Sequence, residues 1–486
     1  MRLNCRRWLL ILVFLLPAPL HSGEPLPGTA PLSLPGDDAS VARRHIKQAT
    51  DYFRRKLAAS AVLRDESWKP DFSAPRAYAT WLAPRRAACR KMLGLGSAKT
   101  AAGEARSTIL AETGGCRVER FTIPVSNRPE SAGLLARGLL FSPITKGPHP
   151  LLVVCGDATQ WPEQMSGLLK GAKPAPWLVK LLGRGAMVYL PQSVERLKDH
   201  PYCKTTNHKD RRQILYRLGY VVGRTMTGLD VEDTLAAIEY FAHRADVDAG
   251  RIGLVGMGQG GMTALYTAAL DRRVQATAVA DYFQTHAQLC DEPVDRRLPG
   301  QFLEFGDAEV AALVAPRLLF VVHSNESSEH DGPVAIESRR AARFYKGLGA
   351  SGRFVVVSSV GGEKMLKKSV ELVSEGMGLP KAVEKVTLPG KPISKSDAKA
   401  QRDRHFAQKL RYLRFLIEAS EEKRQRRWNL AACPVSEFDK VKAAMLADYR
   451  KLVGKVDTEG RPLRPRTDLV LITDTYKAYR VVIDVA

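Results

Sequence analysis

The sequence predicts an α/β protein with a mostly parallel central sheet and helices on both faces of that sheet. Three observations favour this class. Short, continuous apolar runs alternate with longer amphipathic segments from residue 150 onward, as doubly buried strands and their crossover helices do. One apolar run ends in a glycine-rich turn that opens directly into an apolar helical segment. A hairpin of alternating apolar and polar residues precedes the first buried run.

The chain before the sheet is expected to be helical. Residues 41–63 and 74–93 carry apolar side chains at helical spacing, so residues 41–116 are expected to form an N-terminal helical region. The sheet is expected to begin directly after this region. Its first two strands, residues 118–125 and 134–141, alternate in polarity and are expected to form an antiparallel hairpin at one edge.

Strands and helices then alternate along the chain. Apolar runs predict strands at residues 150–155, 186–190, 252–255, 274–280, 318–322 and 354–358. Amphipathic or apolar segments predict helices at residues 177–182, 231–243, 262–270, 338–348 and 402–416. Because a helix between two strands forms a parallel crossover, this order predicts a sheet with helices on both faces.

The glycine-rich turn is the most informative stretch for function. Its residues read Gly-Met-Gly-Gln-Gly from Gly256 to Gly260, which has the spacing of the GxSxG turn that holds a nucleophilic serine between a strand and a helix. The serine position is Gly258. Because glycine has no side chain, this position cannot attack a substrate.

The glycine frame keeps a structural role without the nucleophile. The residue at the tip of such a turn is normally strained by about 1–3 kcal/mol, and Gly258 can adopt the conformation freely. The outer glycines allow the strand and the helix to approach closely. An alternative interpretation is the glycine-rich turn of another doubly wound protein, such as a nucleotide-binding loop.

The N-terminus predicts export. Arginines precede an apolar run at residues 8–16, and small residues follow up to Gly23, which is typical of a cleaved secretory signal at residues 1–22. Residues 23–40 are rich in proline and glycine and are expected to form a flexible leader. The protein is therefore expected to be secreted or periplasmic, without a membrane span once the signal is removed.

Composition indicates a globular protein of 486 residues with a net charge of +23, of which the signal contributes three arginines. The basic residues are spread through the chain, so no nucleic-acid partner is expected and a solvated surface is the simplest interpretation. Binding of an anionic polymer is an alternative. The cysteine spacings match neither a zinc site nor a small disulfide scaffold. No metal or other cofactor is expected.

Several of these stretches together resemble a known superfamily. The hairpin, the buried strand ending in Val153-Val-Cys-Gly156, the turn at residues 256–261 and the Ala-Pro-Arg strand at residues 315–322 are similar to the α/β-hydrolase superfamily. The acetyl xylan esterase and dienelactone hydrolase branch is the most similar. The resemblance covers residues 117–420 and implies an α/β-hydrolase fold with an ester or carbohydrate ligand.

The resemblance also implies a catalytic triad in the order serine, acid, histidine. The serine position holds Gly258, the acid position corresponds to Glu326, with Glu329 and Asp331 nearby, and the histidine position holds Glu363. Because a nucleophile and its base act as a unit, losing both leaves only binding and oxyanion stabilisation. The triad is therefore expected to be degenerate. The remaining candidates for substrate binding are Cys155, Gly156, Met257 and Gln259.

The alternative hypothesis is a catalytic nucleophile at another position in the chain. Cys155 ends the strand that leads toward the turn, and Ser324 lies in the acid loop, so either could serve as a displaced nucleophile. His405 is the only histidine after Glu363 and falls in a basic helical pattern, where a surface position is expected. His323, His330 and the acids of their loop lack a diagnostic metal-ligand spacing, which favours a solvated loop.

The end of the chain resembles an earlier part of it. An ungapped shift of 360 residues places Arg450-Lys-Leu-Val-Gly454 on Arg90-Lys-Met-Leu-Gly94, and further matches follow in the next strand. Residues 421–486 are therefore expected to resemble the start of a second hydrolase unit, and a second hydrolase domain is a candidate partner. Chance similarity is the alternative because the identities are sparse.

Two functions follow as hypotheses. The first is an exported hydrolase-like protein that has lost carboxylester hydrolysis and acts as a binding or packing module. The second is an active carboxylester hydrolase with a relocated nucleophile.

Overall fold

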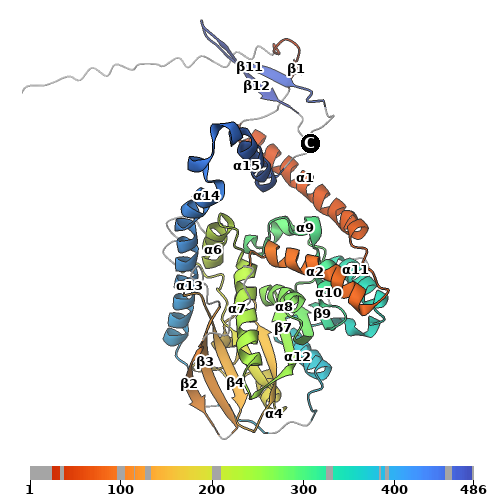
Figure 1. The fold of residues 1–486 in the computed structure, drawn as a ribbon, viewed down its shortest axis with the longest axis vertical. Coiled ribbons are helices and arrows are strands. Elements are labelled where there is room, and N and C mark those ends of the chain that lie inside the picture. Colours follow the sequence, from red (N-terminus) through yellow and green to blue (C-terminus); the bar gives the residue numbers. More distant parts are fainter. Residues whose placement is uncertain are drawn as a thin grey trace, which may run out of the picture. The chain divides into compact units, whose positions relative to one another are not determined.

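The computed structural model describes residues 24–32, 38–95, 104–113, 115–125, 133–199, 210–324, 332–381, 385–388, 393–454 and 462–483. The chain divides into two compact units. The larger is Lys56–Asn429, and the smaller combines Met1–Arg55 with Leu430–Ala486. Figure 1 shows the ribbon of each unit. Helix α1, Asp38–Ser67, runs through the boundary between the two ranges.

A nine-stranded sheet forms the centre of the larger unit, in the order β10-β9-β8-β7-β5-β6-β4-β3-β2. The strands from β10 to β6 pair in parallel, and β6, β4, β3 and β2 pair antiparallel. Their bounds are β2 Arg106–Glu112, β3 Cys116–Pro124, β4 Leu135–Pro143, β5 His149–Cys155, β6 Met187–Pro191, β7 Val247–Met257, β8 Val274–Ala280, β9 Leu318–Ser324 and β10 Phe354–Ser359. The predicted α/β class with a mostly parallel sheet is confirmed.

The edge of the sheet differs from the prediction. Strand β2 pairs with the outer side of β3, so the hairpin of β3 and β4 lies one strand in from the edge. The sequence was expected to be helical up to residue 116. Most side chains of β2 are exposed, and a strand that buries little apolar surface shows no clear apolar alternation.

Helices cover both faces of the sheet (Figure 1). In the larger unit they are α2 Pro75–Met92, α3 Pro162–Met165, α4 Pro176–Gly183, α6 Arg211–Tyr220, α7 Met226–Ala242, α8 Gln259–Leu270, α9 Gln301–Glu304, α10 Asp307–Val314, α11 Pro333–Gly347, α12 Glu363–Gly376, α13 Lys395–Glu418 and α14 Ser420–Trp428. Each predicted helix is present. Helices α3, α6, α9, α10, α12 and α14 were not predicted.

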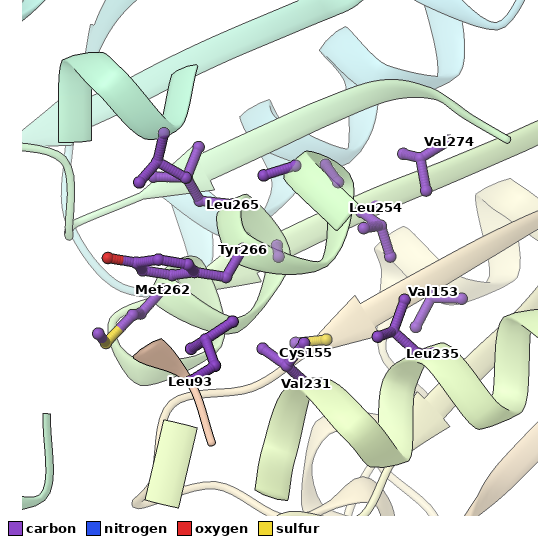
Figure 2. Packing of buried hydrophobic residues seen from close by; sticks show 14 of the residues in the cluster. Leu93, Val153, Cys155, Val231, Leu235, Leu254, Met262, Leu265, Tyr266 and Val274 are labelled. Carbon is purple, nitrogen blue, oxygen red and sulfur yellow. The ribbon is translucent and has the colours of Figure 1, made fainter. Parts of the chain in front are cut away.

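The alternation of side chains along each strand separates two hydrophobic cores. Leu151 and Val153 of β5 join one core with α2, α7, α8 and α10, whereas Leu152 and Val154 join the other with α4 and α12. This split follows from the period of two along a strand. Figure 2 shows the first core, where Leu254 and Val153 from the sheet lie among residues of α7 and α8.

A buried ion pair joins the end of α1 to α10 in the larger unit. Arg64, near the end of α1, donates from Nε to Glu309 Oε2 of α10 at 3.0 Å, and both side chains are almost completely buried. Trp68 packs edge-on against Phe305 and Phe344. Because an unpaired charge would be costly at this depth, the pair fixes the helix position.

The smaller unit contains its own sheet, in the order β1-β11-β12. Strands β1 (Ala30–Pro31) and β11 (Arg466–Ile472) are parallel, and β12 (Lys477–Val482) is antiparallel to β11. Helix α15 is Phe438–Val453. The leader was expected to lack regular structure, but β1 pairs with β11 there, and pairing with a distant strand leaves little local signal. The predicted signal at residues 1–22 lies outside the described residues.

No helix in the described part of the chain combines the length and the apolar character that crossing a bilayer requires.

Replacement of Phe241 by alanine should destabilise the larger unit. The Phe241 ring is fully buried, with ring centroids 5.2 Å from Phe121 and 4.9 Å from Tyr189. Loss of a buried phenylalanine and the resulting cavity cost about 3–5 kcal/mol. Chemical denaturation should show this decrease, whereas the exposed Tyr220→Ala variant should change stability by less than about 0.5 kcal/mol. Equal midpoints for the two variants would contradict the described core.

Candidate active site

The glycine-rich turn joins β7 to α8 with the backbone geometry of a strained tip. Gly258 has φ 56° and ψ −116° and precedes Gln259, the first residue of α8. Its N–H donates to the carbonyl oxygen of Ala280 at 2.9 Å. Residues with a side chain rarely adopt this conformation, and glycine adopts it without strain.

The outer glycines of the turn are required by close backbone contacts. A Cβ built on Gly256 would lie 1.9 Å from the carbonyl oxygen of Gly260. A Cβ on Gly260 would lie 2.1 Å from the carbonyl oxygen of Cys155, at the end of β5. These separations are far shorter than any non-bonded contact between heavy atoms, so only glycine allows the start of α8 to approach the sheet this closely.

A carboxylate occupies the space where a catalytic side chain would project. Asp157 follows β5, and its Oδ1 would lie 2.4 Å from a Cβ built on Gly258. The backbone N–H of Gln259 donates to the same oxygen at 2.9 Å. In a working elbow, the N–H of the residue after the nucleophile binds the oxyanion of the intermediate. Asp157 therefore fills the nucleophile position and also engages this oxyanion donor.

The Asp157 carboxylate is held from several directions. Thr159 donates to Oδ2 from its backbone N–H at 3.1 Å and from its hydroxyl at 2.9 Å. Guanidinium nitrogens of Arg196 and Arg296 lie 3.9 and 3.8 Å from Oδ1. Burial opposes ionisation, but the hydrogen bonds from Gln259 and Thr159 and the charge of Arg196 outweigh it and hold the pKa of Asp157 below its usual value. The carboxylate is thus an anion at neutral pH.

A buried charge network extends behind this carboxylate. Arg196 forms two hydrogen bonds to Asp295, at 3.2 and 3.0 Å. Arg212, which is fully buried, donates to Asp295 and to Asp230. Burial raises the pKa of Asp295, but Arg212 and Arg196 outweigh that effect and lower it to about 2. Because each charge has partners of opposite sign, the network fixes the loops around the elbow.

Gln259 is part of this network. Its side-chain oxygen accepts from Arg196 at 3.0 Å and from Arg296 at 3.3 Å, and the residue is buried. The side chain that was a candidate for substrate binding is therefore engaged by two arginines, and its backbone N–H is engaged by Asp157.

The structure places the other binding candidates around the same turn, in environments that restrict their chemistry. Cys155 is buried and a free thiol, and burial raises its pKa to about 12, so it is a poor source of the reactive thiolate. Gly156 is overlain by the Met165 sulfur, which would lie 2.5 Å from a Cβ there. Met257 is half-buried at the end of β7.

The cavity beside the elbow is small. It is lined by Cys155, Asp230, Asp233, Gln259 and Thr263, among others, and measures about 20 Å³. This volume suits about one water molecule.

The described residues include the predicted histidine position but not the predicted acid position. Glu363 is the exposed first residue of α12. Glu326, Glu329 and Asp331 lie outside the described residues. His323 is partly exposed at the end of β9, and its Nδ1 lies 2.9 Å from the carbonyl oxygen of Ser324. None of the described hydrogen bonds to Asp157 involves a histidine.

His405 differs from the prediction of a surface position. It is buried on α13, and its Nε2 lies 3.6 Å from Asp233 Oδ2. Burial, together with the charges of Lys409 and Arg137, lowers the pKa of His405 well below its usual value. The surface prediction is wrong because the basic residues of α13 also face buried acids: Lys409 donates to Asp233 Oδ1 at 2.5 Å.

His286 is a buried histidine that the sequence analysis missed. Its Nδ1 lies 2.6 Å from Glu292 Oε1, and its Nε2 lies 2.9 Å from Asp307 Oδ2. Burial favours the neutral ring, but Asp307 and Glu292 outweigh it and raise the pKa of His286 to about 10. A charged imidazole with both nitrogens engaged cannot act as a general base. Nothing local in the sequence distinguishes this histidine, because its acidic partners are brought to it by the fold.

Among the described residues, no three His, Cys, Asp or Glu side chains gather in a group that could hold a metal ion.

Replacement of Gly258 by alanine should destabilise the larger unit through two effects. The positive φ angle costs about 1–3 kcal/mol for a residue with a Cβ, and the new methyl group would collide with Asp157 Oδ1. In an Asp157→Ala background the collision disappears, so the loss should shrink toward the backbone strain alone. Chemical denaturation of the four variants measures this coupling. Gly352→Ala, at an open position without positive φ, is the matched control; an equal loss there would contradict the geometry.

The contribution of His286 to stability should depend on pH. Its pKa is raised from 6.5 to about 10 by folding, so its stabilising effect is fully present below about pH 6.5 and is lost as the pH rises through about 10. The difference in unfolding free energy between the wild type and His286→Gln should therefore be larger at about pH 6 than at about pH 10. A difference that grows with pH would rule out the charged imidazole.

Part of the chain is similar to known proteins. Residues 178–293 match the model of the Dienelactone hydrolase family. The chain is 32% identical over 150 residues to YtaP of Bacillus subtilis (strain 168), which is described provisionally as a hydrolase; the match covers 29% of this chain and 50% of that protein. The chain thus spans about half the length of this curated relative.

The comparison with solved structures gives matches with TM-scores below 0.5. A protein of Bacteroides fragilis NCTC 9343, provisionally named an acetyl xylan esterase, has a TM-score of 0.48 and 12% identity, with 62% of this chain and 81% of that chain covered. Glucuronoyl esterase from Solibacter usitatus has a TM-score of 0.46 and 15% identity, with 63% and 94% covered. The sheet order and the strand, turn and helix at the elbow are those expected from the resemblance to the α/β-hydrolase superfamily, and the match to the Dienelactone hydrolase family covers residues 178–293 of the larger unit.

Proposed function

We propose that this α/β-hydrolase domain does not hydrolyse carboxylesters and acts as a packing or binding module of an exported protein. The observation that carries the proposal is the Asp157 carboxylate, which occupies the nucleophile position over Gly258 and accepts the hydrogen bond from Gln259 N–H. The elbow thus keeps the backbone of an enzyme and lacks the reactive group.

Loss of the nucleophile alone leaves some catalysis in a hydrolase site, because oxyanion stabilisation and substrate binding persist. Here the expected oxyanion donor, the backbone N–H of Gln259, already donates a hydrogen bond to the Asp157 carboxylate. A substrate carbonyl oxygen would have to displace Asp157, which Thr159 and the nearby Arg196 and Arg296 hold in place. Both sources of residual catalysis are therefore weakened.

A relocated cysteine nucleophile has less support. The Cys155 thiol is buried in the strand end, and its pKa of about 12 favours the unreactive protonated form.

Packing has more support than ligand binding at the elbow. The resemblance to esterases makes an ester or carbohydrate the proposed ligand class, but the cavity beside the turn measures only about 20 Å³. The basic surface is a weaker candidate: Arg424 and Arg426 of α14 pair with Glu421 and Glu422 on the same helix, as on an ordinary solvated face. Export is proposed from the predicted signal at residues 1–22.

Turnover of p-nitrophenyl acetate tests the proposal. The purified full chain should release nitrophenol no faster than buffer. Gly258→Ser should also be inactive, because its hydroxyl would meet Asp157 and no described imidazole contacts that carboxylate. Folding of each variant should be checked by circular dichroism and thermal unfolding.

Wild-type turnover within the usual enzyme range of about 1–10³ s⁻¹ would overturn the proposal. Two variants then locate the chemistry. Loss of that activity in Cys155→Ser would assign it to the buried thiol, and loss in Asp157→Asn would assign it to the carboxylate. A serine- or thiol-directed ester probe, mapped by mass spectrometry, provides an independent measurement, because an inert domain forms no stoichiometric adduct.

A further inference from the structure

The C-terminal helix and hairpin repeat the elements that open the hydrolase domain. A constant offset of 360 places β11 (Arg466–Ile472) on β2 (Arg106–Glu112) residue for residue. The same offset places α15 (Phe438–Val453) over α2 (Pro75–Met92), with ends that agree within a turn. The sparse identities of the sequence repeat therefore fall on equivalent helices and strands.

The strand pairing repeats with the same register. Arg466 pairs with Val482, as Arg106 pairs with Thr122, and each later pair keeps the offset. Both hairpins have a register shift at the same place, between Ile109 and Ala111 in β2 and between the equivalent residues in β11. Register is fixed by the pattern of side chains and by the turn, so a shared irregularity indicates a common origin.

The turn and the helix end also repeat. Thr473 N–H donates to the Tyr476 carbonyl oxygen at 2.9 Å, as Thr113 N–H donates to the Cys116 carbonyl oxygen at 2.9 Å. In each turn the threonine hydroxyl also accepts from two following backbone N–H groups. Both helices are followed by a glycine with positive φ, Gly94 at 73° and Gly454 at 81°.

The two copies differ in what covers them. Apolar side chains that are buried in the first copy are exposed in the second. The pairs, with their exposed fractions, are Tyr78 at 3% and Phe438 at 46%, Cys89 at 0% and Tyr449 at 62%, Leu93 at 1% and Val453 at 61%, Phe121 at 1% and Val481 at 54%, and Ile123 at 1% and Ile483 at 43%. In the described part of the smaller unit, only Thr467 and Leu469 are buried.

In the first copy these positions are covered by the rest of the hydrolase core. Strand β4 pairs with the inner edge of β3 along its length, Phe121 packs against Phe241 of α7, and the Tyr78 hydroxyl donates to the Ala312 carbonyl oxygen of α10. In the second copy β12 ends its sheet, so its outer edge has no strand partner among the described residues. An apolar face beside an open strand edge is typical of an interaction surface.

We infer that the exposed face of α15 and β12 is the docking surface for a second α/β-hydrolase core. That core would add an antiparallel strand to the edge of β12, as β4 does to β3, and would cover α15 with helices equivalent to α8 and α10. The core in the larger unit cannot be the occupant, because α2, β2 and β3 already fill this position. For the same reason, a second copy of this chain offers no vacant position.

A chimera of the full chain tests whether the second copy fits a hydrolase core. Residues 435–483 replace residues 75–123, and the rest of the chain is unchanged. The inference predicts a folded larger unit, with native-like far-ultraviolet circular dichroism and one cooperative thermal transition for that unit. The matched control is the same chimera with Val481→Lys and Ile483→Lys, which places charges where Phe121 and Ile123 are buried; it should lose the transition. A chimera that unfolds like this control would overturn the inference.

The wild-type chain supplies two further measurements. Sedimentation velocity should show a monomer at micromolar concentration; a dimer that dissociates in the Val481→Lys, Ile483→Lys variant would assign the face to a second copy and overturn the inference. The same variant should leave the melting temperature of the full chain unchanged, because both side chains are exposed. A clear decrease would mean that the face is already covered within this chain, which would also overturn it.

Discussion

The close backbone contact between the elbow and the end of β5 is the constraint on which the rest of the site depends. Gly260 approaches the Cys155 carbonyl oxygen so closely that no side chain fits, and this approach brings Asp157, two residues further along, over Gly258. The same contact directs the N–H of Gln259 at the Asp157 carboxylate. The fold thus places a donor and an anion together where an enzyme of this class would place a donor and a substrate oxygen.

The charges around Asp157 stabilise its ionised carboxylate above the elbow. An ionised carboxylate in a partly buried turn requires hydrogen bonds or opposite charge, and Thr159, Arg196 and Arg296 supply both. Arg196 is in turn fixed by Asp295, which also holds the fully buried Arg212. Because these groups compensate one another, removing a single charge leaves its partners uncompensated. The elbow therefore retains a demanding structural role without its nucleophile.

The backbone of the elbow and the side chains at its tip are separate observations. The tip conformation of Gly258 and the glycines around it keep the strand, turn and helix that hold a catalytic serine in related proteins. A match to a hydrolase family consequently describes the scaffold, and the activity must be argued from the side chains at the site.

The sequence by itself determined the fold class, the strand order along the chain and the missing hydroxyl at Gly258, because these depend on local apolar periodicity and on one residue in a short motif. It did not reveal β2, whose exposed side chains carry little pattern. Only the tertiary structure placed Asp157 over Gly258, buried His405 beside Asp233 and set His286 between Glu292 and Asp307. These partners are separated along the chain and meet through the packing of loops and helices at the sheet, which no local pattern records.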